Sequence, residues 1–285
     1  MRTTHATAGA LLLAAALGTG HDARADVLDD IVERGEIRFG VREAAAPFSY
    51  LDKGGQPAGL AVGLCRRIAA AIQRRLNLSE LKLTYVIIDP LTRFPSLDAR
   101  ETDLVCDPAT ATLGRREIVD FSIPYFMDGI GAALRREGVQ ELEALKGQPV
   151  GAVAGTTAVK LASDLAAPVG SPLVEYPDYE TGMRALGAGK IDIFFGDQGL
   201  LLHQLGELQR EDGQIPIHVI DDQLSFEPYA LSMRLGEHRL RTEVDRALSA
   251  MYRSDEIFLE IEAALGQFEM SDLTALIYAL MALPE

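Results

Sequence analysis

The strongest constraint on the fold is an alternation of strand-like and helical segments that runs along the chain twice. In the first round, short apolar runs at residues 36–41, 83–88 and 104–106 are separated by helical patterns at 59–76 and 91–100. The runs have the length of buried strands, whereas 59–76 repeats its apolar residues at helical spacing. Such alternation predicts sheets that are covered by helices, which is the α/β class.

The pattern restarts after residue 134. Strands are predicted at 149–153, 173–176, 189–195 and 217–220, and helices at 157–166, 180–188 and 198–208. Beyond the first 25 residues the chain still has about 260, which is more than one hydrophobic core usually holds. We therefore expect two lobes.

Two extended stretches, at 130–134 and 229–234, lie where the two rounds meet. We expect the chain to cross between the lobes there, so that the second lobe is inserted within the first. The predicted boundaries are 26–131 together with 230–285 for lobe 1, and 132–229 for lobe 2.

The first 25 residues have the pattern of a cleavable export signal. Arg2 gives a positive start, residues 8–17 form an apolar run, and Ala23 and Ala25 are the small residues before a cleavage site at Asp26. The run is shorter than the about 20 residues that a membrane-spanning helix needs, and no later stretch reaches that length. We therefore expect that the signal peptide is cleaved off and that the mature protein is periplasmic.

The charge of the chain excludes some partners. The formal charge is −15, and the part after residue 25 contains 25 basic and 41 acidic residues. A surface of this sign repels phosphate backbones and anionic lipid headgroups. Nucleic acid and anionic membrane surfaces are therefore poor partners.

Cys65 and Cys106 are the only cysteines. Both fall in the first predicted lobe, and in an oxidising compartment one pair permits one disulfide. The sequence is compatible with a Cys65–Cys106 bridge and with two buried thiols. No histidine lies at ligand spacing from either cysteine, so we expect no metal site and no cofactor.

Residues that suit a small charged ligand follow several predicted strands. The stretch 104–125 contains a loop with hydroxyl groups, including Thr110, and then Arg115. A guanidinium holds a carboxylate through two parallel hydrogen bonds. Further candidates follow other strands: Arg42, Arg93, Thr156 and Asp197. Because ligands of such sheets bind beyond the carboxyl ends of the strands, we expect these side chains to meet in one cleft.

The same residues also have structural explanations. Arg115 is close in sequence to Glu117 and Asp120, either of which would make a surface ion pair with it. Asp197 directly precedes a predicted helix, where it would act as an N-terminal cap. Thr156 and Thr157 would likewise serve only as helix caps, and Arg42 and Arg93 would be solvated charges.

Together these segments resemble the periplasmic solute-binding proteins of bacterial amino-acid ABC transporters, family 3, and most of all their glutamate/aspartate branch. The matching stretches are 40–43, 47–50, 92–95, 103–125, 146–147, 155–157 and 189–197. The resemblance implies the type II periplasmic binding protein fold, in which two mixed-sheet α/β lobes are joined by two hinge crossings. It also implies a monomer that closes on an amino acid and delivers it to the membrane permease of an ABC transporter.

The resemblance assigns roles to the candidates. It implies that Arg115, with Thr110 beside it, binds the α-carboxylate of the ligand and that Asp197 binds the α-ammonium. Thr156 and Thr157 would add donors at a helix N-terminus, where the helix dipole favours anions.

The acidic-ligand branch has further basic groups for the side-chain carboxylate, and Arg42 and Arg93 match them. Such cations are needed because a buried unpaired charge is very costly. Phe48 corresponds to an aromatic wall of the cleft, although as an apolar residue it would also fit the hydrophobic core. Tyr179 stands where a histidine often contacts the side-chain carboxylate.

The chain departs from that branch in the first-lobe loop. Where the branch has a loop like Gly-Ser-Thr-Thr, residues 107–110 read Asp, Pro, Ala and Thr. Pro108 has no backbone N–H, and Asp107 adds a carboxylate. Gly63 also replaces an acid of the first long helix. These departures leave amino-acid binding in place and bear on which amino acid is bound.

We expect a binding protein, not an enzyme, with glutamate-like or aspartate-like ligands favoured. One alternative is an enzyme on the same scaffold, because a fold does not determine a function. A dehydratase would need a general acid in the cleft, for which Asp107 and Glu227 are the candidates. The other alternative is a ligand-sensing module.

Overall fold

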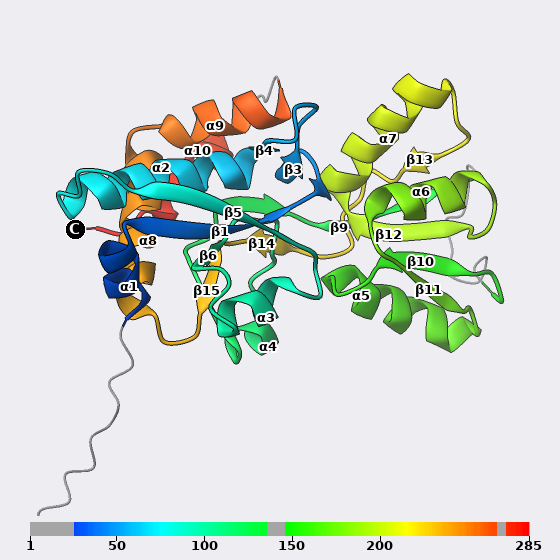
Figure 1. Ribbon diagram of the computed structural model, residues 1–285. Helices are drawn as coiled ribbons and strands as arrows, with labels where there is room; N and C mark the ends of the chain where they lie inside the picture. Colours follow the sequence, from blue (N-terminus) through cyan, green and yellow to red (C-terminus); the bar gives the residue numbers. More distant parts are fainter. Residues whose placement is uncertain (1–25, 136–145, 267–271, 285) are drawn as a thin grey trace, which may run out of the picture.

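The computed structural model describes residues 26–135, 146–266 and 272–284. The predicted signal peptide, residues 1–25, lies outside the described residues. Two α/β lobes lie next to each other, each built around a five-stranded sheet with helices on both faces (Figure 1). Within the described ranges, none of the helices has the length and apolar character needed to cross a bilayer.

The sheet of lobe 1 has the strand order β5-β1-β6-β15-β7. Its strands are β1 (Glu36–Arg42), β5 (Lys82–Ile88), β6 (Leu104–Val105), β7 (Val119–Phe121) and β15 (Ser232–Arg234). Strands β1, β5 and β6 are parallel, and Gly40 is in register with Val86 on one side and Val105 on the other. Strand β15 runs antiparallel between β6 and β7, which makes the sheet mixed.

Lobe 1 also contains most of the helices. They are α1 (Val27–Arg34), α2 (Leu60–Arg75), α3 (Arg93–Asp98), α4 (Leu113–Arg116), α8 (His238–Arg253), α9 (Glu256–Leu265) and α10 (Asp272–Met281). A small sheet of β2 (Ala44–Ala45), β3 (Ser49–Leu51) and β4 (Pro57–Ala58) follows β1. Helix α2 buries Leu64, Ile68 and Ile72, which share one face because they recur every four residues.

The sheet of lobe 2 has the strand order β11-β10-β12-β9-β13. Its strands are β9 (Ile130–Leu134), β10 (Val150–Val153), β11 (Leu173–Tyr176), β12 (Ile193–Asp197) and β13 (His218–Val219). Its helices are α5 (Thr157–Ala166), the 3-10 helix η2 (Ala167–Val169), α6 (Tyr179–Gly187) and α7 (Gln198–Asp212). Strand β10 is parallel to β11 and β12, whereas β9 is antiparallel to β12.

Two short strands join the lobes. They are β8 (Phe126–Asp128) and β14 (Glu227–Tyr229), and they pair antiparallel to each other. The crossings expected at 130–134 and 229–234 are displaced by a few residues, because those stretches contain β9 of the second sheet and β15 of the first. The lobe boundaries at residues 131 and 229 stay a prediction.

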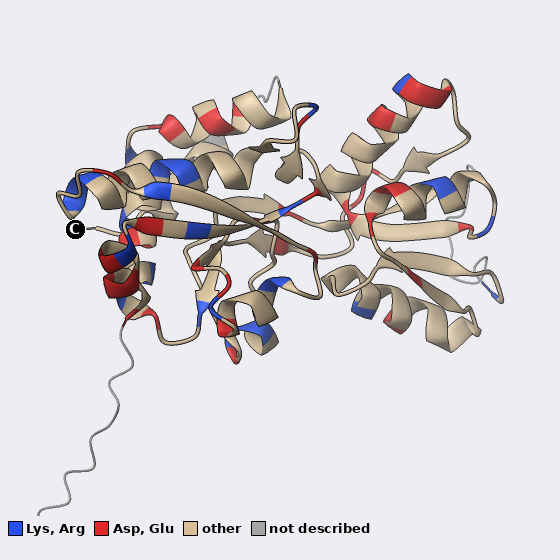
Figure 2. Ribbon diagram, viewed as in Figure 1, with Lys and Arg blue, Asp and Glu red and all other residues tan. Residues whose placement is uncertain are grey.

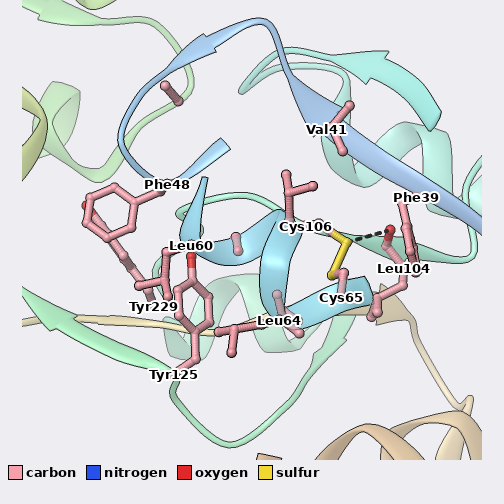
Figure 3. Packing of buried hydrophobic residues seen from close by; sticks show 14 of the residues in the cluster. Phe39, Val41, Phe48, Leu60, Leu64, Cys65, Leu104, Cys106, Tyr125 and Tyr229 are labelled. Carbon is pink, nitrogen blue, oxygen red and sulfur yellow. Dashed lines mark hydrogen bonds between the residues drawn. A yellow bond between two sulfur atoms is a disulfide. The ribbon is translucent and has the colours of Figure 1, made fainter. Parts of the chain in front are cut away.

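Cys65 of α2 and Cys106, directly after β6, form a disulfide with an S–S distance of 2.05 Å. Figure 3 shows it packed among the buried side chains of Phe39, Leu64 and Leu104. Of the two alternatives compatible with the sequence, the structure has the disulfide.

Acidic residues occur at both ends of the molecule. Figure 2 shows them on α1 and α9 of lobe 1 and on α7 of lobe 2. The negative charge is therefore a general property of both lobes.

Candidate functional site

One cavity between the lobes brings together most of the residues selected from the sequence. Its lining consists of Arg42, Arg93, Pro108, Thr110, Arg115, Thr156, Thr157, Tyr179, Asp197 and Leu200. All of the candidate ligand-binding residues except Phe48 are in this set.

The carboxyl ends of the lobe 1 strands position one side of the cavity. Arg42 is the last residue of β1, and Arg93 is the first residue of α3, which follows β5. Thr110 follows β6. Arg115 lies in the short helix α4, where its backbone N–H donates to the N-cap hydroxyl of Thr112 at 3.2 Å. Since β1, β5 and β6 are parallel and adjacent, the residues after them reach the same edge.

Lobe 2 contributes residues from the starts of three helices. Thr156 is the N-cap of α5 and Thr157 its first residue, while Tyr179 is the first residue of α6. Asp197 ends β12 directly before α7, and Leu200 lies in the first turn of α7. Helix N-termini carry a partial positive charge, so this side of the cavity also suits anionic groups.

Two arginines share one carboxylate at the cavity. Arg93 is only 2% exposed; its Nη1 donates to Asp107 Oδ2 at 3.0 Å and its Nη2 to the Gly155 carbonyl at 3.3 Å. Arg42 Nη1 lies 4.0 Å from the same carboxylate oxygen. Burial lowers the pKa of Arg42 below its ordinary value, which the charge of Asp107 partly offsets. One carboxylate cannot neutralise two guanidiniums, so positive charge remains.

Arg115 has no carboxylate partner among the described residues. Its Nη1 donates to the Thr110 carbonyl at 2.9 Å, and its Nη2 donates across the lobes to the Gly155 carbonyl at 3.2 Å. Burial, and then the positive charge of Arg93, lower the pKa of Arg115 below its ordinary value. A bound anion would compensate this partly desolvated charge. The surface ion pairs considered for Arg115 are not formed.

Asp197 is a buried acid on the opposite side of the cavity. It is 4% exposed, and its Oδ1 has no hydrogen-bond partner in the described part of the chain. Its backbone N–H donates to Tyr179 Oη at 2.9 Å, and its side chain makes no capping bond to α7. Burial, with the nearby charge of Asp128, raises the pKa of Asp197 to about 7. A cationic group at this position would stabilise the carboxylate.

The two threonine hydroxyls already have partners. Thr156 Oγ1 donates to the Val153 carbonyl at 2.7 Å. Thr157 Oγ1 donates to Glu227 Oε2 at 2.9 Å, which connects α5 to the crossing strand β14. The hydroxyls therefore hold the start of α5 in place.

Phe48 does not line the cavity. Its ring is fully buried and packs edge-on against Phe126 and Tyr229, with centroid distances of 5.0 and 5.1 Å. Figure 3 shows Phe48 beside Tyr229. These aromatic neighbours come from the crossing strands, so the position of Phe48 depends on contacts that its own sequence segment does not reveal.

Pro108 and Leu200 line the cavity but were not selected as ligand-binding residues. Pro108 is one of the residues in which the loop departs from the acidic-ligand branch. The available signal for Leu200 was its position three residues after Asp197, at the start of a helix, which brings its side chain back toward the end of β12.

The arrangement suits recognition of a zwitterion. Guanidiniums on lobe 1 and an unpartnered carboxylate oxygen on lobe 2 face one small cavity. In the part of the chain that the structure describes, no group of three or more His, Cys, Asp or Glu side chains is arranged to hold a metal ion.

Two α/β lobes joined by paired crossing strands, with a charged cavity between them, define a class of two-lobe ligand-binding proteins. The chain belongs to the bacterial extracellular solute-binding proteins, family 3, which it matches over residues 37–260. The expected family and the two-lobe type II fold are confirmed.

The similar proteins are named for different ligands. The L-glutamate/L-aspartate-binding protein of Pseudomonas aeruginosa is 30% identical over 234 residues, or 81% of this chain and 76% of the relative. The solved cysteine-binding protein from Campylobacter jejuni has a TM-score of 0.76 at 22% identity and covers 88% and 97% of the two chains. An ancestral arginine-binding protein bound to arginine has a TM-score of 0.72 at 25% identity, with 82% and 99% covered. One fold therefore serves several ligands.

Proposed function

We propose that the protein captures an amino acid between its lobes, outside the cytoplasm, and delivers it to the permease of an ABC transporter. Acidic amino acids are the favoured ligands. The observation that carries the proposal is the charge of the cavity, where Arg42, Arg93 and Arg115 lie opposite Asp197. A free amino acid has a carboxylate and an ammonium, and both need a partner when water is excluded.

The main-chain groups of the ligand find their partners on both lobes. Arg115, fixed by the Thr110 carbonyl, has no carboxylate partner among the described residues and binds the α-carboxylate through its planar fork. The unpartnered Oδ1 of Asp197 accepts a hydrogen bond from the α-ammonium. The N-terminus of α5, at Thr156 and Thr157, adds positive potential beside the carboxylate.

The side-chain carboxylate of an acidic ligand lies at Arg42 and Arg93, with Tyr179 nearby. Burial raises the pKa of Tyr179 well above its ordinary value, so its hydroxyl stays neutral. Asp128 and Glu227 are buried near Asp197 and add negative charge at the end of the site that takes the ammonium. At the other end, Arg42, Arg93 and Asp107 sum to +1 if all are ionised, and the side-chain carboxylate of an acidic amino acid neutralises this charge.

We further infer a binding protein, not an enzyme. The two acids considered for catalysis are both engaged: Asp107 with Arg93, and Glu227 with the hydroxyls of Thr157 and Ser225. Neither is among the lining residues of the cavity.

The name of the Pseudomonas aeruginosa relative also favours an acidic ligand. We propose a periplasmic monomer.

A thermal-shift screen of ligand-stripped protein that begins at Asp26 tests the function. A ligand at 100 times its Kd stabilises by about 2.7 kcal/mol, which for a chain of this size raises Tm by roughly 5–10 °C. We expect that shift with glutamate or aspartate. Shifts with neutral or basic amino acids alone would refute the acidic preference, and no shift with any amino acid would refute the function. Turnover of a prephenate-like substrate would favour the enzyme.

A further inference from the structure

Asp107 is a buried carboxylate that the proposed ligand contacts do not use. It has no exposed surface and directly precedes Pro108 of the cavity lining. Its Oδ2 accepts from Arg93 Nη1 at 3.0 Å and lies 4.0 Å from Arg42 Nη1. Its Oδ1 is also buried and has no hydrogen-bond partner among residues 26–135, 146–266 and 272–284. Within the described residues, these two arginines are its only ion-pair partners.

The chain holds this carboxylate in place from both sides. The preceding residue, Cys106, is bonded to Cys65, and the following residue is Pro108, whose ring fixes its φ angle. Tyr125 Oη donates to the Asp107 carbonyl at 3.0 Å. The backbone at Asp107 therefore cannot easily turn the side chain away from the arginines.

The consequence is electrostatic. Arg42 and Arg93 without Asp107 would present two positive charges to the ligand side chain. With Asp107 the three groups sum to a single positive charge, enough to neutralise one carboxylate. The same acid repels that carboxylate, while an uncharged amide of the same shape is nearly unaffected.

We propose that Asp107 determines specificity by setting the charge of the side-chain end of the site, and that it limits how strongly acidic ligands are preferred over their amides. The inference rests on the proposed function, since it requires an amino acid whose side chain lies at Arg42 and Arg93. It extends that function to a residue in which this chain differs from the acidic-ligand branch that it resembles.

The test compares glutamate and glutamine, which have the same shape and differ by one charge. Their Kd values are measured by calorimetry for the wild type and for Asp107→Asn, in which an amide replaces the carboxylate. We expect the ratio of the glutamine Kd to the glutamate Kd to rise by about tenfold or more. An unchanged or lower ratio, or a folded variant that binds neither ligand, would overturn the proposal. If the wild type binds no amino acid, the proposed function fails instead.

Asp103, directly before β6, provides a matched control for Asp107, which follows the same strand. It is 2% exposed and its carboxylate pairs with Arg34 at 2.8 Å and Arg38 at 2.7 Å, none of which lines the cavity. Asp103→Asn should lower stability and leave the ratio unchanged. Asp107→Glu retains the charge and should keep the ratio nearer to that of the wild type than Asp107→Asn does. A ratio raised equally by Asp103→Asn would attribute the effect to net charge and refute a specific role of Asp107.

A measurement on the wild type does not depend on how the variants fold. Two glutamate analogues are compared, in which a methylphosphinate with one negative charge or a phosphonate with two replaces the side-chain carboxylate. The two groups have nearly the same tetrahedral shape. At a pH where the phosphonate is doubly ionised, we expect the methylphosphinate to bind at least as tightly. Tighter binding of the phosphonate would mean that the side-chain end is not limited to one negative charge.

Discussion

Arg115 and Arg116 are adjacent in sequence, yet only the first lines the cavity. Arg116 is exposed and lies over the ring of Phe121, 5.5 Å from its centroid. We expect Arg115→Ala to weaken amino-acid binding by about 100-fold or more, because two charge-assisted hydrogen bonds to the α-carboxylate are lost. Arg116→Ala is the matched control and should change the Kd by no more than about twofold. Calorimetry measures the Kd of both variants, and their Tm values check that they are folded. Equal affinities of the two variants would contradict the assignment of Arg115 to the α-carboxylate.

At Asp197, the raised pKa of about 7 predicts a pH-dependent affinity. Below this pH the free protein carries a proton on Asp197, and the ligand ammonium displaces it because a neighbouring cation favours the carboxylate. Binding thus releases a proton, so affinity should rise about tenfold per pH unit up to about 7 and level off above it. Calorimetry between the acid and neutral limits measures this slope, and Asp197→Asn should abolish it. A flat profile in the wild type would show that Asp197 is already ionised.

At the scale of elements, the sequence predicted the strands and helices that depend on a local pattern of apolar residues. The apolar runs that became β1 and β10, and the helical repeat that became α2, need only their own residues to be recognised. The site residues at the ends of these strands followed from the same pattern, because parallel strands end at a common edge. Strand β12 begins at Ile193, later than predicted, since pairing with β10 begins at that residue.

What the sequence did not predict depends on contacts between distant segments. The crossing strands β8 and β14 have three residues each and include Asp128 and Pro228, so no apolar run marks them. The sequence does not distinguish a Cys65–Cys106 bond from two thiols, because cysteine spacing does not give the distance between α2 and β6. Phe48 is buried by aromatic rings of the crossing strands, which its own position in the chain cannot indicate.

At the scale of the whole molecule, the proposed ligand capture requires the lobes to approach each other, and Gly155 is one point of contact between them. Its carbonyl accepts hydrogen bonds from Arg93 and Arg115 of the other lobe. Its φ angle is +74°, and a Cβ there would lie 2.8 Å from Leu91 Cδ2 and 3.0 Å from the Pro90 carbonyl carbon. The absence of a side chain at residue 155 therefore permits this approach of the lobes.

Gly155→Ala should impair closure, because the added methyl group meets the backbone of Pro90 before the arginines reach the carbonyl. We expect the Kd for the amino-acid ligand to rise by about tenfold or more. Hinge closure decreases the radius of gyration, which solution scattering measures, and in this variant the decrease should become smaller or disappear.

Gly170→Ala is the control: residue 170 lies in the same lobe with a φ of +69°, but a Cβ there has no atom within 4 Å. Both variants incur the strain of a positive φ, about 1 kcal/mol, so a loss of affinity common to both would reflect stability. A loss confined to Gly155→Ala would assign this glycine to lobe closure, whereas wild-type affinity and compaction in that variant would refute the role.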